Sequence, residues 1–245
     1  MGTSNDPVHA AWHRIREIDA LRGVAVVAMV IYHAAFDLDF FRVMDIDLAA
    51  FPWNTLARIA QILFISLGGV TFALSFEKSR TQGVKHAVTG RVMHALSLFL
   101  FALGISAVTH LLFSGQGVKF GILHFFSVAI LLSTAFVKLR TWNVALGLAI
   151  IALGTFIPST GPWWLFPLGI RSATFQSLDY FPLVPWYGLF LVGMGLTSHW
   201  LRNHRMDAYR PRLKVQWLES LGRRSLVIYL VHQPVLAGII LLFRQ

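Results

Sequence analysis

The sequence contains no cysteine, and only 13% of its 245 residues are charged. Without cysteine, disulfides, zinc–thiolate sites and cysteine nucleophiles are excluded. Acidic residues are scarce, at 11 against 21 lysines and arginines. The sequence also lacks a phosphate-binding loop, an HExxH motif, a GxSxG motif and an acid-rich metal cage. We therefore expect no bound metal.

Apolar residues, in contrast, make up 56% of the chain, and the mean hydropathy is +0.63. These values are typical of a polytopic membrane protein, because soluble domains carry more charge and fewer apolar residues. The first apolar segment is long, carries charged residues and lacks a small-residue cleavage site, so we interpret it as a retained transmembrane helix. We predict one all-α transmembrane domain over residues 1–245.

Seven apolar segments have about the length that a membrane-spanning helix requires, roughly 17–25 residues. Glycines and prolines between them support the boundaries. The sequence therefore predicts a bundle of about seven transmembrane helices. The predicted helices cover Ile18–Phe36, Ala57–Phe76, Val92–Leu112, Phe120–Val137, Trp142–Ile157, Leu183–His199 and Arg224–Leu242.

The distribution of basic residues predicts the orientation of this bundle. With the N-terminus on the inner side, 16 of the 21 lysines and arginines lie in inner segments and five in outer segments. Such a bias indicates a cytoplasmic N-terminus and, with seven spans, an outer C-terminus. The same bias explains the excess of lysine and arginine, because these residues flank the inner surface of the lipid bilayer. A nucleic-acid partner is therefore not expected. We expect a multi-pass protein of the cell inner membrane.

The first predicted helix carries four ionisable residues, Asp19, Arg22, His33 and Asp37. At about 100° per residue they share one stripe roughly 60° wide. A charge near the centre of a membrane helix costs at least about 2.5 kcal/mol, so the stripe is expected to face protein or a water-filled cavity. The alternative is that Asp19 pairs with Arg22 near the inner surface and His33 makes an ordinary polar contact.

Three of the ten histidines lie at membrane depth, His33, His124 and His232. A neutral imidazole can remove a proton from an attacking amine or hydroxyl, or can itself accept an acyl group. Asp37, one turn beyond His33, could orient that ring. Tyr229 shares one face of the last helix with His232. For each histidine alone, a structural polar contact remains the alternative.

Several segments together resemble one family. RIREIDALRGVAVVAMVIYHAAFDL is similar to the opening of the heparan-α-glucosaminide N-acetyltransferase catalytic-domain family, which belongs to the broader transmembrane acyltransferase superfamily. Later blocks of that family resemble, in the same order, FISLGGVTFALS, FGILHFFSVAILL, DYFPLVPWYGLFLVGMGL and GRRSLVIYLVHQPVL. The chain would be a short, bacterial-type member.

The resemblance implies a cytoplasmic acyl-CoA donor, usually acetyl-CoA, and a sugar or glycan acceptor at the outer face. His33 would be the general base or the transient acyl acceptor, with Asp37 orienting it. His124 and His232 would line the acyl tunnel and position the thioester or stabilise its oxyanion. Further predicted substrate contacts are Asp19, Arg22, Tyr229, Gln233, Asp179, Trp186, Arg223 and Arg224, of which the arginines would meet CoA phosphates. The positive-inside rule alone also explains the arginines. A homodimer is compatible with the sequence.

The chain departs from the lysosomal-type enzymes of the family in one respect. Those enzymes carry a key histidine in the loop after the first helix, where this chain has Leu48, Ala49, Ala50 and Phe51. His33 stands instead at a helix position where they carry asparagine. Two other function classes stay open. Histidines at matched depth suit a haem- or quinone-binding electron carrier, and the stripe on the first helix suits a proton-coupled transporter.

Overall fold

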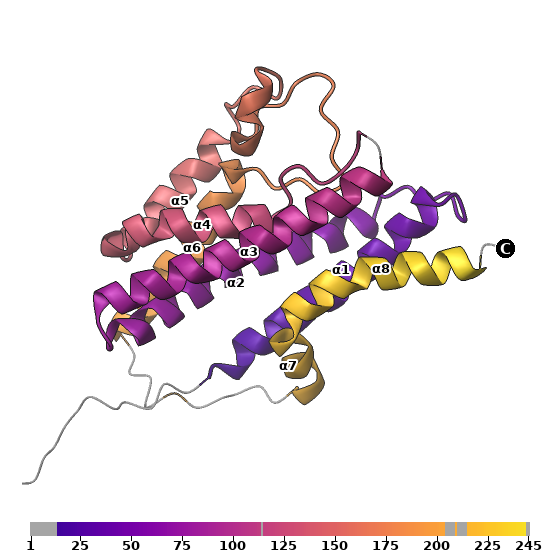
Figure 1. Cartoon of the computed structure of the whole chain (residues 1–245). Coiled ribbons are helices and arrows are strands. Elements are labelled where there is room, and N and C mark those ends of the chain that lie inside the picture. The colour runs from indigo at the N-terminus through magenta and orange to yellow at the C-terminus, as the bar shows by residue number, and fades with distance from the viewer. Residues whose placement is uncertain (1–13, 114, 204–208, 210–214, 244–245) are drawn as a thin grey trace, which may run out of the picture. The chain divides into compact units, whose positions relative to one another are not determined.

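A computed structural model describes residues 14–113, 115–203, 209 and 215–243 (Figure 1). Residues 1–13 and most of 204–214 lie outside the described residues. The second range holds four of the basic residues assigned to the inner side, Arg205, Arg210, Arg212 and Lys214. Regular secondary structure in the described part is helical throughout, and only two isolated β-bridges accompany it. The all-α prediction is therefore confirmed. The α-helices are α1 (Arg16–Phe40), α2 (Trp53–Arg80), α3 (Val84–Leu112), α4 (Ile122–Phe136), α5 (Trp142–Leu153), α6 (Leu183–Asn203), α7 (Gln216–Arg223) and α8 (Ser225–Phe243), with 3₁₀ turns η1 (Val137–Leu139) and η2 (Trp163–Leu168).

Each of the seven predicted segments overlaps one of the helices α1–α6 and α8. The largest difference is at the beginning of the third segment, because α3 begins at Val84, eight residues before the predicted start. The fifth segment is shorter than predicted, because α5 stops at Leu153, four residues before the predicted end. Gly154 follows as the C-cap, and residues 154–156 form a turn. The eighth helix, α7, has only eight residues. It was not among the predicted spans because it is too short to cross a bilayer.

Five described helical segments are long and apolar enough to cross a membrane: Arg16–Phe40, Trp53–Arg80, Val84–Leu112, Ile122–Leu139 and Ser225–Phe243. Helix α5 is apolar but has only 12 residues. Large apolar side chains such as Leu100, Leu112 and Phe243 are exposed on these helices, as expected for surfaces that face lipid. The chain is thus a multi-pass membrane protein. The count of about seven spans and the cytoplasmic N-terminus stay predictions.

The described residues form two compact units. One unit, here called the α3–α6 unit, comprises described residues 68–203, and the other, the α1/α8 unit, comprises residues 14–67, 209 and 215–243. The boundary falls within α2, so residues 53–67 of this helix belong to the α1/α8 unit and residues 68–80 to the α3–α6 unit. That residues 1–245 fold as a single domain stays a prediction.

Small residues allow helices of the α3–α6 unit to pack closely. A Cβ atom at Gly147 of α5 would overlap the Gly188 carbonyl of α6, and one at Gly195 would lie 2.7 Å from the Val144 backbone nitrogen. In α2, a Cβ atom at Gly69 would overlap the carbonyl of Phe190. Small residues at such positions let transmembrane helices approach to backbone contact. The α5–α6 hairpin is therefore defined by glycine contacts along its length.

The α1/α8 unit is built around α1. Helix α7 meets α1 through two glycines, because a Cβ atom at Gly222 would overlap the Asp19 carbonyl and one at Gly23 would overlap the Leu218 carbonyl. Further along α1, Ala28 and Met29 pack with Ala60 of α2, and Tyr229 of α8 packs against this cluster. These contacts set the rotation of α1 and α8, and with it the direction of the polar side chains they carry.

Candidate functional site

His33 of α1 and His232 of α8 face each other within the α1/α8 unit. Their ring centroids are 4.8 Å apart and the rings meet at 78°, in an edge-to-face arrangement. His232 is buried, with 7% of its surface exposed, and His33 is partly buried. Two of the three histidines predicted at membrane depth therefore lie side by side, although they come from the first and the last helix described.

Backbone hydrogen bonds determine which nitrogen of each ring carries the proton. His33 Nδ1 lies 2.9 Å from the Met29 carbonyl oxygen, and His232 Nδ1 lies 2.6 Å from the Tyr229 carbonyl oxygen. A carbonyl oxygen only accepts, so Nδ1–H is the donor in both rings, and each Nε2 keeps its lone pair when the ring is neutral. His232 Nε2 is buried and has no hydrogen-bond partner within the described part of the chain. Both rings thus present a basic nitrogen.

Asp37 and Gln233 form a second pair between α1 and α8. Asp37 lies one helical turn after His33, and Gln233 directly follows His232. Asp37 is buried, with 4% exposure, and its carboxylate accepts a hydrogen bond from the Gln233 side chain. The other Asp37 oxygen, Oδ2, and Gln233 Oε1 are buried and have no partner among the described residues. The hydrogen-bond partner of His33 Nδ1 is the Met29 carbonyl. That Asp37 orients His33 stays a prediction.

Within the part of the chain that the structure describes, these four side chains leave three buried acceptor atoms without a donor. These atoms are His232 Nε2, Asp37 Oδ2 and Gln233 Oε1, and they come from adjoining turns of α1 and α8. A buried polar atom without a partner is unfavourable by about 1–3 kcal/mol and calls for an explanation. A ligand with N–H or O–H donors would satisfy these atoms. Tyr229 lies beside them, with its ring 5.7 Å from that of His232.

Ion pairs surround the beginning of α1. Asp19 is buried, and its two oxygens accept hydrogen bonds from Arg14, one of them at 3.0 Å. The sequence left open a pair between Asp19 and Arg22. The hydrogen bonds of Asp19 come from Arg14, and Arg22 is attracted to Asp19 electrostatically. The hydrogen bond to Asp19 raises the pKa of the Arg14 guanidinium.

A second acidic residue at this end of α1 was not predicted. Glu219 of α7 is buried and accepts a hydrogen bond of 2.8 Å from Arg16, and Arg223 lies 3.9 Å from it. The sequence contained a signal for an ion pair at this position, since Glu219 is the only acidic residue of α7 and stands four residues before Arg223. Arg223 and Arg224 are exposed. The contact of CoA phosphates with Arg22, Arg223 and Arg224 stays a prediction.

The other predicted site residues belong to the α3–α6 unit. His124 of α4 is buried between two aromatic rings, with centroids 5.9 Å from Phe99 and 5.7 Å from Phe120. Trp186 of α6 packs on Phe181, with ring centroids 5.5 Å apart. Substrate contacts of His124 and Trp186 remain predictions.

Asp179 has a structural role that explains its position. Its Oδ2 accepts a hydrogen bond of 3.0 Å from the backbone N–H of Ile122, the first residue of α4. The first four N–H groups of a helix have no partner within the helix, and an acidic side chain also interacts favourably with the helix dipole. Asp179 therefore fixes the beginning of the helix that carries His124.

Among the described residues, no group of three or more His, Asp or Glu side chains is arranged to hold a metal ion. Comparison with protein-family models identifies the catalytic region of heparan-alpha-glucosaminide N-acetyltransferase, matching residues 14–234. The chain belongs to this family. Comparisons with curated proteins and with solved structures found no match. The resemblance proposed from the sequence blocks is thus confirmed, and with it a transmembrane, acetyltransferase-like class of enzyme.

Proposed function

We propose that this protein transfers an acyl group, acetyl in the first instance, from cytoplasmic acyl-CoA to an amine or hydroxyl of a sugar or glycan at the outer face of the inner membrane. The observation that carries the proposal is the set of three buried acceptor atoms, one of them on His232, that have no donor among the described residues and lie beside His33. Amino and hydroxyl groups of a sugar supply the donors that these atoms lack. Membership of an acetyltransferase family supports the acyl donor.

The reaction requires removal of one proton. The acceptor nitrogen or oxygen attacks the thioester carbonyl, the carbon–sulfur bond breaks, and CoA leaves as the thiolate. A general base takes the proton from the attacking group and returns it to the thiolate. His33 is our choice for this base, because its Nδ1–H is held by Met29 and its Nε2 keeps a lone pair. In the alternative route, Nε2 of His33 first accepts the acyl group.

The remaining residues bind and position substrates in this proposal. A neutral His232 has no N–H left for an oxyanion, because its proton points to Tyr229 O. We therefore assign His232 Nε2, with Asp37 and Gln233, to the acceptor N–H or O–H groups, and retain the oxyanion role for His124. Tyr229, Trp186 and Asp179 remain proposed substrate contacts. The proposed contacts of CoA remain Asp19, Arg22, Arg223 and Arg224.

The proposal can be tested with purified protein in proteoliposomes. Labelled acetyl-CoA on the N-terminal side and glucosamine on the other should yield labelled N-acetylglucosamine, and His33→Ala should abolish this product while acetyl-CoA binding persists. His110→Asn, which changes an exposed histidine at the end of α3, is the matched control and should leave transfer unchanged. A folded protein that binds no acetyl-CoA, or that purifies with the Soret band of haem, would reject the acyltransferase in favour of a carrier.

A further inference from the structure

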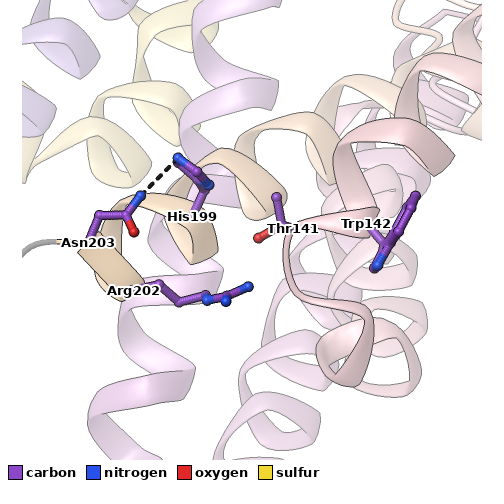
Figure 2. A pocket seen from close by; sticks show the side chains of 5 residues that line it. All are labelled: Thr141, Trp142, His199, Arg202 and Asn203. Atoms are coloured by element: carbon purple, nitrogen blue, oxygen red, sulfur yellow. Dashed lines mark hydrogen bonds between the residues drawn. The ribbon is translucent and has the colours of Figure 1, made fainter.

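A cavity of about 380 Å³ opens between the beginning of α5 and the end of α6 in the α3–α6 unit. It is lined by Thr141, Trp142, His199, Arg202 and Asn203 (Figure 2). Arg202 extends from the end of α6 toward the α5 side, where Thr141 is located. The cavity therefore collects polar side chains from two helix ends that meet within one unit.

The lining is rich in hydrogen-bond donors. The Thr141 hydroxyl is the N-cap position of α5, makes no capping bond, and its buried oxygen has no partner among the described residues. Asn203 Nδ2 lies 2.9 Å from His199 Nε2, so the amide donates to this nitrogen and His199 keeps its Nδ1–H as a further donor. Arg202 adds the forked donors of its guanidinium.

No carboxylate among the described residues neutralises the positive charge of the Arg202 guanidinium. The α3–α6 unit contains two acidic residues, Glu77 and Asp179, and both are engaged elsewhere. Glu77 pairs with Arg80, and Asp179 accepts from the N–H of Ile122. Lys138 and Arg140 precede Thr141 and add positive charge. A donor-lined cavity with excess positive charge at a helix N-terminus fits an anion such as a phosphate group.

Apolar surface continues from the cavity along both helices. Trp142 is 75% exposed at the first residue of α5. Tryptophan is enriched at membrane–water interfaces, where its ring sits at the level of the headgroups. On α6, Leu196 is 56% exposed and lies about 4.5 Å before His199 along the helix axis. A molecule that combines a phosphate with acyl chains would match this arrangement, in which a polar cavity is followed by apolar surface.

We propose that this cavity binds the phosphate of an anionic phospholipid headgroup. Arg202 and Thr141 contact the phosphate oxygens, and the acyl chains follow the exposed surface around Trp142 and Leu196. The site is separate from the His33–His232 pair in its residues, and it does not depend on the proposed transferase reaction.

The test uses the full chain, purified in detergent and depleted of lipid, with native mass spectrometry to count and titrate bound lipid. Phosphatidylglycerol should occupy one site at least about tenfold more tightly than phosphatidylcholine, because both carry a phosphate diester and only the first carries net charge. Arg202→Gln should weaken phosphatidylglycerol binding about tenfold. Thr141→Val, which keeps the charge, should weaken it about threefold and provides a second variant should Arg202→Gln fail to fold.

Arg80→Gln is the matched control, because Arg80 is an exposed arginine of the same unit outside the cavity. It should leave the affinity unchanged. Equal losses in Arg80→Gln and Arg202→Gln, or several equivalent phosphatidylglycerol molecules, would show that basic charge acts without a site and would overturn the proposal. Displacement of the lipid by inorganic phosphate or by coenzyme A at millimolar concentration would assign the cavity to a soluble phosphate and also overturn it.

Discussion

His33 and His232 meet edge to face, with ring centroids 4.8 Å apart, and each donates its Nδ1 proton to a carbonyl of its own helix. This relationship leaves two basic nitrogens at one place between α1 and α8. It also restricts what these histidines can do while neutral, since neither retains an N–H for a substrate.

Asparagine at either position would place an amide nitrogen close to the place of Nδ1 but would lack the Nε2 lone pair. We expect His33→Asn to lower the rate of acetyl transfer by about 10²- to 10⁴-fold, the usual contribution of a general base. Acetyl-CoA binding, measured by calorimetry, should be unchanged. His232→Asn should mainly raise the KM for the acceptor. Near-normal turnover in His33→Asn would move the base to His232 or His124.

The contact between α7 and α1 depends on the absence of a side chain at Gly222. Gly222→Ala would place a methyl group on the Asp19 carbonyl and force the helices apart, which usually costs about 1–3 kcal/mol of stability. We expect a lower melting temperature in detergent. Gly104→Ala in α3 is the control, because a Cβ atom there meets nothing within 4 Å. It should leave stability unchanged or raise it slightly. Equal melting temperatures in the two variants would contradict the α1–α7 contact.

Asp179 can act as a helix cap, as a substrate contact or as both, and two substitutions separate these roles. Asp179→Ala removes the acceptor for the Ile122 N–H and should cost about 0.5–2 kcal/mol of stability. Asp179→Asn keeps an acceptor oxygen and should cost much less. Melting temperatures and acceptor KM values are the measurements. Two variants of wild-type stability that both lose acceptor binding would show that the substrate contact is the main role.

Seven spans with a cytoplasmic N-terminus place Thr81 on the cytoplasmic side of the membrane and the last residue on the outer side. A fluorescent-protein fusion after Thr81, between α2 and α3, should fluoresce in the cytoplasm. An alkaline phosphatase fusion after the last residue should be active outside. The physical reason is the excess of basic residues in the segments assigned to the inner side. Phosphatase inactivity together with cytoplasmic fluorescence of a C-terminal fusion would show an even number of spans.

Much of the architecture was predictable because helix formation in a membrane protein depends on local sequence. Apolar segments of sufficient length must satisfy their backbone hydrogen bonds internally, so hydropathy predicted helices at the seven positions where α1–α6 and α8 occur. The family was also visible in ordered local blocks and was confirmed over residues 14–234. The end of α5 was less predictable, because residues 154–157 remain apolar enough to continue a helix although a turn begins at Gly154.

The sequence by itself thus determined the helices, the membrane class and the set of polar residues at membrane depth. The tertiary structure decided which of them meet: His33 with His232, Asp37 with Gln233, and Asp19 with Arg14. It also assigned Asp179 to the beginning of α4. Helical periodicity gives the angle of a side chain around its own axis, but the rotation of one helix against another depends on packing of distant residues such as Gly23 with Leu218 and Met29 with Ala60. These contacts join segments far apart in the chain, and local sequence carries no record of them.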